Sequence, residues 1–227
     1  MNQFWLFENI NLFELLCPHK FKEYSKTHSF SNFTKGDFIY VEGDIAKNFY
    51  LISKGKVKVG FWDETGEEIV MTYLKKGDIF GESVVLNQTV RKEFAQAVEN
   101  NTELCPVNLI QAEELMRGNK NFSISIYKFI GYKFRKIERK YQIMLFRNTR
   151  TRAIEFIKEI KDEDFTSQKF ENGDILINNP YSQLELAKLI GTSRPTFNLL
   201  INEFQEEGYL IWQKGKILLK NKFVLEF

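Results

Sequence analysis

The period of the apolar residues changes twice along this chain, and each change limits what the segment can fold into. From residue 30 to residue 107, short runs rich in β-branched and aromatic residues alternate with polar residues. This is the period of a strand that buries one face. Turn sequences such as Gly36-Asp37, Gly43-Asp44 and Gly77-Asp78 interrupt the runs. Several short strands with regular turns are typical of an antiparallel sandwich or barrel.

Residues 118–146 change to a helical period. Their apolar residues follow the 3-4-3-4-3 spacing of a coiled-coil seam: Tyr127, Ile130, Phe134, Ile137, Tyr141 and Met144. The other faces are polar, because the segment holds seven basic residues and one acidic residue. The pattern predicts a long helix that pairs with a second copy of the chain. A long helix that covers the β domain instead is the alternative.

Residues 147–227 alternate helical and hairpin patterns. A short amphipathic helix is followed by a hairpin turn at Asn172-Gly173, by two helices, and by a second hairpin that bends at Lys214-Gly215. This is the element order of a winged helix-turn-helix. The three segments predict an α+β chain with domains at residues 1–117, 118–146 and 147–227.

The two C-terminal helices are separated by the sequence Gly191-Thr192-Ser193-Arg194-Pro195. Ser182 and Glu185 match the capping box, which predicts a helix that starts at residue 183. Gly191 can adopt the left-handed conformation that turns the chain. Thr192 or Ser193 can cap the second helix, and Pro195 is tolerated only in a first turn. The sequence therefore predicts a helix-turn-helix rather than one interrupted helix.

The second helix has an apolar face and a polar face that can read DNA. Arg194 and Asn198 lie one turn apart on the polar face, and arginine pairs with guanine while asparagine pairs with adenine. Leu199, beside them, can contact a thymine methyl group. Basic residues of the final hairpin add phosphate contacts. The predicted DNA-binding residues are Lys188, Thr192, Ser193, Arg194, Thr196, Asn198, Leu199, Lys214 and Lys216. The alternative is a helical hairpin with a solvated polar face.

Composition removes several other classes of protein. The two cysteines, Cys17 and Cys105, are far apart in the sequence, and the histidines are only His19 and His28. A cysteine-ligated zinc or iron–sulfur site is excluded within one chain, no metal site is predicted, and both cysteines are expected in the core. No apolar run reaches the length of a membrane span. The N-terminal sequence lacks the pattern of a signal peptide, so a cytoplasmic protein is expected.

Three stretches together resemble the Crp–Fnr superfamily of bacterial transcription regulators. They are "GDIAKNFYLISKGKVKVGFWDETGEEIVMTYLKKGDIFGE", the heptad segment, and "IGTSRPTFNLLINEFQEEGYL". The resemblance implies an N-terminal β-roll of the cyclic-nucleotide-binding jelly-roll type, a long dimerisation helix and a winged helix-turn-helix. It further implies a homodimer that binds double-stranded DNA at a palindromic operator, with RNA polymerase as a further partner and a small-molecule effector. Residues around Asn148 are then expected to form the hinge.

The same resemblance makes Gly81, Glu82, Arg91 and Lys92 the candidate effector-binding residues. Gly81-Glu82 and Arg91 match the family's phosphate-binding cassette, whereas Lys92-Glu93 departs from it, because an acid replaces the expected hydroxyl residue. A carboxylate beside a phosphate is unfavourable. Cyclic AMP is therefore disfavoured as the effector, the effector is unidentified, and no cofactor is predicted.

In the recognition helix, Ser193, Arg194 and Thr196 match the family pattern, while Pro195 and Leu199 replace base-reading residues of the type member. DNA binding at a different operator is therefore expected. Two other functions stay as alternatives: a nucleotide-sensing module that binds protein instead of DNA, and a metal-dependent β-barrel enzyme. The enzyme would need clustered histidine and carboxylate ligands, and neither histidine lies in the strand region.

Overall fold

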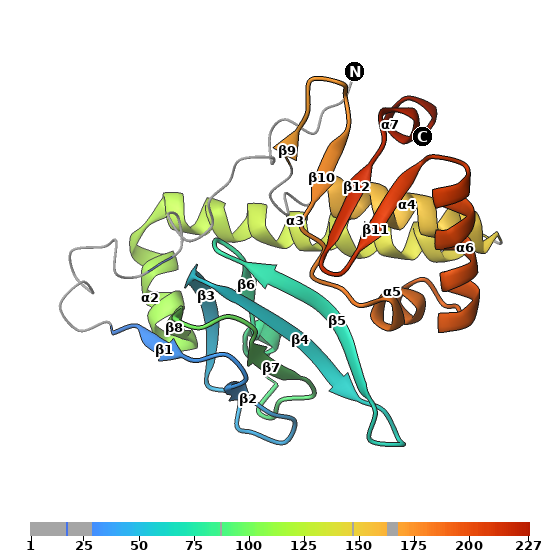
Figure 1. Cartoon of the computed structure of the whole chain (residues 1–227). Helices are drawn as coiled ribbons and strands as arrows, with labels where there is room; N and C mark the ends of the chain where they lie inside the picture. The colour runs from blue at the N-terminus through green and yellow to red at the C-terminus, as the bar shows by residue number, and fades with distance from the viewer. Residues whose placement is uncertain (1–16, 18–28, 87, 147, 163–167) are drawn as a thin grey trace. The chain divides into compact units, whose positions relative to one another are not determined.

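The computed structural model divides the chain into two compact units (Figure 1). They comprise Met1–Arg135 and Lys136–Phe227. The structure describes residue 17 and residues 29–86, 88–146, 148–162 and 168–227. One helix, α3 (Lys120–Leu145), contributes its first turns to the first unit and its last turns to the second. The hinge predicted around Asn148 follows the end of this helix.

Two four-stranded antiparallel sheets form the first unit. One contains, in order, β1 (Ser31–Phe33), β8 (Thr102–Asn108), β3 (Asn48–Lys54) and β6 (Ile79–Phe80). The other contains, in order, β2 (Phe38–Tyr40), β7 (Phe94–Ala97), β4 (Lys56–Trp62) and β5 (Glu68–Lys75). Every strand pair in the two sheets is antiparallel. The prediction of an antiparallel sandwich is confirmed.

Alternation along the strands supplies two separate cores. In β3, Ile52 points into a cluster shared by both sheets, while Phe49 and Leu51 point to the opposite face of their sheet. The shared cluster consists of Tyr40, Ile52, Val57, Val59, Leu74, Phe80, Ala95 and Leu104. Because all of its members are buried, this cluster holds the two sheets face to face.

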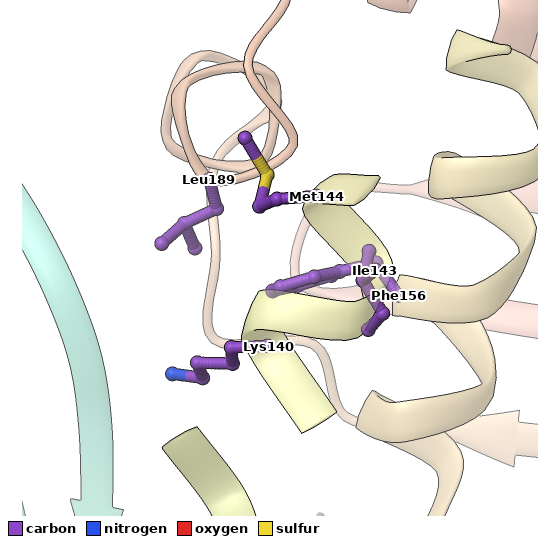
Figure 2. A pocket seen from close by; sticks show the side chains of 5 residues that line it. All are labelled: Lys140, Ile143, Met144, Phe156 and Leu189. Atoms are coloured by element: carbon purple, nitrogen blue, oxygen red, sulfur yellow. The ribbon is translucent and has the colours of Figure 1, made fainter. Parts of the chain in front are cut away.

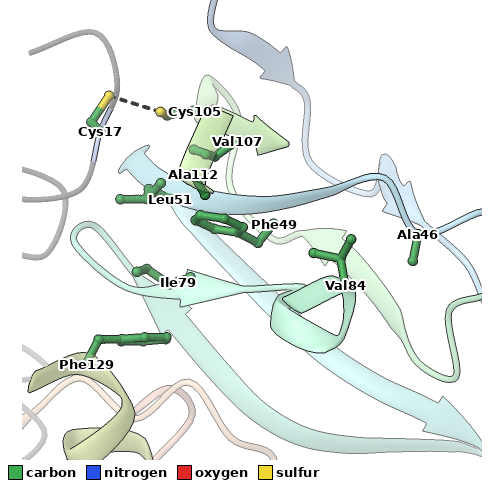
Figure 3. Close-up of a cluster of buried hydrophobic side chains, with 10 residues drawn as sticks. All are labelled: Cys17, Ala46, Phe49, Leu51, Ile79, Val84, Cys105, Val107, Ala112 and Phe129. Atoms are coloured by element: carbon green, nitrogen blue, oxygen red, sulfur yellow. Dashed lines mark hydrogen bonds between the residues drawn. The ribbon is translucent and has the colours of Figure 1, made fainter. Parts of the chain in front are cut away.

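Helices cover the other face of the first sheet (Figure 3). Ala112 of α2 (Leu109–Gly118) and Phe129 of α3 are buried there together with Phe49 and Leu51. Val84 of the short 3₁₀ helix η3 (Glu82–Leu86) belongs to the same cluster. Phe129 of the long helix therefore covers part of the β domain, as the alternative prediction for this helix says. Pairing with a second copy of the chain stays a prediction.

Both cysteines lie in this second cluster, as expected. The Sγ atoms of Cys17 and Cys105 are 3.0 Å apart, and both residues are fully buried. The hydrogen bond with Cys17 and burial both raise the pKa of the Cys105 thiol. A buried, protonated thiol behaves as a small apolar side chain.

The second unit alternates helices and short strands after α3. Its elements are α4 (Thr149–Asp162), β9 (Gln168–Lys169), β10 (Ile175–Ile177), α5 (Gln183–Leu189), α6 (Arg194–Glu206), β11 (Leu210–Gln213), β12 (Lys216–Leu219) and α7 (Asn221–Glu226). The strands form one sheet in the order β11-β12-β10-β9. The predicted turns are present, because Gly173 and Gly215 have φ values of +83° and +75°. The winged helix-turn-helix order is confirmed.

Asp174 fastens the two hairpins of this unit to each other. Its Oδ1 accepts a hydrogen bond from the backbone N–H of Asn221, and its Oδ2 accepts one from Lys220 Nζ at 3.0 Å. These two hydrogen bonds hold the pKa of the Asp174 carboxyl below its usual value. The hairpin of β11 and β12 is the wing of the winged helix-turn-helix. It is thus attached to the preceding hairpin through polar contacts as well as through the pairing of β10 with β12.

Candidate nucleic-acid interface

The first helix of the helix-turn-helix begins at the predicted capping box. Ser182 Oγ accepts a hydrogen bond from the backbone N–H of Glu185 at 3.2 Å, and Glu185 Oε2 accepts one from the backbone N–H of Ser182 at 2.6 Å. The two bonds satisfy amide groups that a helix start leaves unpaired. Helix α5 accordingly starts at Gln183, as predicted.

The turn between the two helices depends on Gly191. Its φ is +66°, and a Cβ atom at this position would lie 2.9 Å from the Cε of Met144. Ser193, rather than Thr192, caps α6, because its Oγ accepts a hydrogen bond from the backbone N–H of Thr196 at 3.3 Å. Pro195 lies in the first turn of α6. The backbone N–H groups of a first turn have no partner within the helix, so the proline costs no hydrogen bond.

Helix α6 buries one face and presents the other to solvent. Phe197, Ile201 and Phe204 are each at most 1 % exposed. Arg194 and Leu199 point outward, and Leu199 is 65 % exposed. A leucine this exposed on a well-packed domain is available for contact with a partner.

The remaining predicted residues of the helix-turn-helix differ in exposure. Ser193 and Thr196 are exposed, while Lys188, Thr192 and Asn198 are half-buried. The Oδ1 atom of Asn198 is buried and accepts no hydrogen bond within the described chain. Asn198 therefore lies at the edge of the outward face, and its amide oxygen is not presented to solvent.

The basic residues of the wing fall into two pairs. Lys214 and Lys216, at the bend of the β11–β12 hairpin, are exposed and form no ion pair in the part of the chain that the structure describes. Lys220 instead binds Asp174, and Lys222 Nζ donates a hydrogen bond to the backbone carbonyl of Glu207 at 3.0 Å. Two lysines are thus free to meet phosphates and two are held by the domain itself.

A hydrogen bond connects the wing to α6, and two ion pairs connect acidic residues at the end of α6 to α4. Gln205 Oε1 accepts a hydrogen bond from the backbone N–H of Trp212 at 2.9 Å, which joins α6 to β11. Arg150 forms ion pairs with Glu203 and Glu207 at the C-terminal end of α6. The two carboxylates are therefore partly neutralised, so the field over α6 is less unfavourable to an approaching polyanion. The ion-paired residues are far apart in the sequence, and no local pattern predicts these contacts.

The candidate effector cassette is brought together, but its arginine is turned inward. Arg91 is 2 % exposed. Its Nη1 donates hydrogen bonds to the Gly81 carbonyl at 2.8 Å and to Ser83 Oγ at 3.3 Å, and its Nη2 bonds the carbonyl of Asn48. The guanidinium also lies 4.1 Å from the centre of the Tyr40 ring.

The other cassette residues are also engaged or point away. Glu82 Oε1 lies 2.9 Å from Lys133 Nζ of α3, and Lys92 is exposed. Burial and the nearby Glu93 carboxylate raise the pKa of Tyr40, whose hydroxyl donates a hydrogen bond to Glu93. The Nη atoms of Arg91 and the carboxylate of Glu82 are thus bonded by the chain itself, whereas Arg91 Nε is buried without a hydrogen-bond partner among the described residues.

The heptad residues of α3 form an exposed apolar stripe. Their exposed fractions lie between 46 % for Met144 and 68 % for Tyr127. The stripe comprises Tyr127, Ile130, Phe134, Ile137, Tyr141 and Met144. An uncovered apolar stripe at coiled-coil spacing is the surface that a second helix covers.

Neither a membrane helix nor a metal cluster is present where the structure describes the chain. None of the helices in these ranges is long and apolar enough to cross a membrane. Within the same ranges, no group of three or more His, Cys, Asp or Glu residues could hold a metal ion.

Two family models match the two parts of the chain. The model for the cyclic nucleotide-binding domain matches residues 30–119, and the model for the Crp-like helix-turn-helix domain matches residues 151–226. This chain belongs to the Crp–Fnr superfamily. The superfamily consists of DNA-binding transcription regulators rather than enzymes, so the protein is a transcription regulator of this type with a nucleotide-binding-like effector domain. The function predicted from the sequence is confirmed at this level.

Curated relatives cover most of the chain at low identity. The CRP-like cAMP-activated global transcriptional regulator of Mycobacterium tuberculosis is 22% identical over 192 residues, which are 84% of this chain and 83% of the relative. The anaerobic regulatory protein of Bacillus subtilis is 23% identical over 93% of this chain and 85% of its own length.

Solved structures share the fold over most of the chain. A mutant of CooA from Carboxydothermus hydrogenoformans has a TM-score of 0.75 at 23% identity and covers 96% of this chain and 95% of its own. The regulator CLP of Xanthomonas campestris has a TM-score of 0.67 at 18% identity, with coverage of 88% and 97%. At these identities the likeness concerns the fold.

Proposed function

We propose that this regulator binds a palindromic DNA site as a homodimer through the outward face of α6 and the tip of the wing. The observation that carries the proposal is the outward face itself, where Arg194 forms no ion pair or hydrogen bond among the described residues. Lys214 and Lys216 add two unpaired charges on the hairpin that follows. An unpaired guanidinium suits bidentate contact with guanine, and the lysines suit contacts with phosphate.

The stripe on α3 supports the homodimer. Its six residues follow the 3-4 spacing of a seam that pairs with an identical seam. A two-fold axis between two such helices presents two recognition helices about one turn of DNA apart, or a multiple of it. The domain division at residues 1–117, 118–146 and 147–227 is part of the proposal, with the middle segment as the dimerisation helix.

We propose that cyclic AMP is not the effector, because the cassette arginine is already bonded within the chain. The Arg91 guanidinium is bonded to Gly81, Ser83 and Asn48 and lies against the Tyr40 ring, so a phosphate would have to displace buried contacts. Glu82 is occupied by Lys133. We infer an effector other than cyclic AMP, or none, and no cofactor. Isothermal titration with cyclic AMP is expected to show no binding at millimolar ligand, and saturable binding would overturn this part.

RNA polymerase and the cellular location follow from the regulator's task. A transcription regulator meets polymerase at the promoter, and it works where the DNA is, so we propose polymerase as a partner and the cytoplasm as the location. The alternative, a protein-interaction module that does not bind DNA, has no specific contact in its favour. The free Arg194 and the two wing lysines favour DNA.

The deciding experiment selects bound duplexes from random double-stranded DNA with the full-length protein. A palindromic motif with a fixed spacing is expected, together with one dimer bound per site in sedimentation analysis. The matched variants are Arg194→Ala on the outward face of α6 and Arg117→Ala on an exposed part of α2. Only the first is expected to lose enrichment. A protein that enriches no motif, at low salt as well as at 150 mM salt (roughly the physiological ionic strength), would refute the proposal.

A further inference from the structure

One arginine in α4 bonds three segments of the second unit at once. Arg152 Nε donates a hydrogen bond to the Ile190 carbonyl at 2.7 Å, and its Nη1 donates one to the Phe146 carbonyl at 2.7 Å. Its Nη2 donates to the Gly191 carbonyl at 3.3 Å and to Thr149 Oγ1 at 3.2 Å. The guanidinium therefore lies between the end of α3, the start of α4 and the turn of the helix-turn-helix.

The acceptors explain why an arginine is needed at this position. Phe146 directly follows α3, and Ile190 and Gly191 directly follow α5. Carbonyl groups at the C-terminal ends of helices carry partial negative charge and lack partners within the helix. Only arginine presents several donors in one rigid plane with a permanent positive charge. A lysine could bond one or two of these carbonyls but could not span all of them.

Apolar contacts also join the end of α3 to α4 and α5, and these three elements form the junction (Figure 2). Ile143, in the last turns of α3, is 1 % exposed, and the Cε of Met144 lies where a Cβ atom on Gly191 would collide with it. A small pocket at the junction is lined by Lys140, Ile143, Met144, Phe156 and Leu189. The C-terminal turns of α3 thus pack against α4 and α5 within the same compact unit.

An ion pair joins α3 to α4 one turn further back. Arg139 bonds Glu155, which also accepts a hydrogen bond from Lys158 Nζ at 2.8 Å. Burial raises the pKa of the Glu155 carboxyl, but the hydrogen bonds from Lys158 and Arg139 outweigh burial and hold this pKa below its usual value. The junction has polar contacts at both of its ends.

We propose that Arg152 is a positioning residue that fastens the recognition element to the last turns of α3. The orientation of α6 is then fixed by the direction in which α3 ends, so a rotation of the dimer helices turns the recognition helices with them. The hinge is then not the segment around Asn148, because Arg152 bridges that segment. The inference rests on the proposed DNA-binding function and assigns the residue that fixes the spacing between its half-sites.

The test compares Arg152→Gln and Arg152→Lys with Arg150→Gln, a matched control on the same helix. Arg150 bonds the far end of α6 and forms no hydrogen bond or ion pair with the described residues of α3. Four duplexes are titrated: one half-site, the selected palindrome, and two palindromes whose centres are one base pair longer and one base pair shorter. Wild type is expected to prefer the selected spacing at least tenfold.

Arg152→Gln is expected to bind the half-site within twofold of wild type, to bind the palindrome at least tenfold more weakly, and to discriminate the spacings less than threefold. The affinity and spacing discrimination of Arg152→Lys should lie between those of wild type and Arg152→Gln. Arg150→Gln should keep the spacing preference of wild type. Unchanged spacing discrimination in Arg152→Gln would overturn the inference. An equal loss on half-site and palindrome would also overturn it, because that result indicates a general effect on the domain.

A second readout does not depend on DNA. Spin labels are attached at the exposed positions 142 and 206, in protein diluted with unlabelled chains, and the distance distribution between them is measured. A broader distribution in Arg152→Gln than in wild type and Arg150→Gln is expected, and an unchanged width would contradict the inference. If wild type binds no DNA, the proposed function fails, and this measurement still decides whether Arg152 fixes the junction.

Discussion

The effector cassette and the recognition turn each place an arginine after a glycine of positive φ, yet the two arginines have opposite surroundings. Arg91 is 2 % exposed, bonds two carbonyls and a hydroxyl, and lies against an aromatic ring. Arg194 is exposed and makes no such contact among the described residues. Both match the family pattern in sequence. A motif that matches in sequence therefore indicates a binding site only where its donors remain available.

The largest expected effect is on the free energy of unfolding when the buried Arg91 is replaced. Arg91→Gln should lower the free energy of unfolding by about 3 kcal/mol, because it leaves buried carbonyls without a donor. Urea unfolding at one protein concentration measures it. Lys92→Gln, at the exposed neighbour, should change the value by less than about 0.5 kcal/mol. If Arg91→Gln were as stable as wild type, Arg91 would be free to bind an effector, and the contrast with Arg194 would disappear.

The outward arginine should show the reverse behaviour. Arg194→Ala is expected to weaken binding to the selected operator by about 1–3 kcal/mol and to leave the free energy of unfolding within about 0.5 kcal/mol of wild type. Fluorescence anisotropy at fixed salt and urea unfolding measure the two quantities. A variant that loses stability but keeps its affinity would place Arg194 in the fold instead of at the interface.

Within the wing, the same distinction separates free lysines from held ones. Because a homodimer carries each lysine twice, Lys214→Gln and Lys216→Gln should each reduce the slope of log K against log[salt] by about two, on operator and random DNA alike. Lys222→Gln should change the slope less, because Lys222 is bonded to the Glu207 carbonyl. Titrations between roughly 50 and 200 mM salt, over which several phosphate contacts together lose orders of magnitude in affinity, test this. Equal slopes for all three variants would show that the held lysine also reaches phosphate.

The smallest expected effect is that of replacing Glu155, which forms an ion pair with the partly exposed Arg139. Because the folded-state pKa of Glu155 is lowered, its charge stabilises the fold above the usual carboxyl pKa, and this contribution is lost as the pH falls through the folded value. Glu155→Gln should therefore be slightly less stable than wild type at pH 7, by less than about 1 kcal/mol. The difference should begin to shrink as the pH falls through the usual carboxyl pKa of about 4.3, and it should vanish below the lowered folded-state pKa. A difference that persists at acid pH would exclude the ion pair as its cause.

Local chemistry explains which features the sequence could predict. The capping box at Ser182, the left-handed Gly191 and the serine cap at Ser193 depend on residues within four positions of one another, and all three are present. The heptad stripe and the strand alternation are likewise periodic signals. These features position the recognition helix, so its outward face was predictable.

Contacts between distant residues account for what the sequence could not predict. Arg91 bonds Asn48, and Arg152 bonds Ile190, across 43 and 38 positions of the chain. No periodicity or spacing connects such pairs, because only the folded chain brings them together. The only signal for Arg152 was a basic residue inside an amphipathic helix, and such residues usually face solvent.

Under the proposed function, Arg194 reads a guanine in the DNA. The most direct measurement titrates wild type and Arg194→Ala against the selected operator with each symmetric pair of guanines replaced by 7-deazaguanine, which lacks the N7 acceptor. For one pair, wild-type affinity is predicted to fall about 100-fold, because two base contacts are lost at roughly 1.4 kcal/mol each, while Arg194→Ala is unaffected by the replacement. Equal losses in the two proteins, or no loss at any guanine, would contradict the claim.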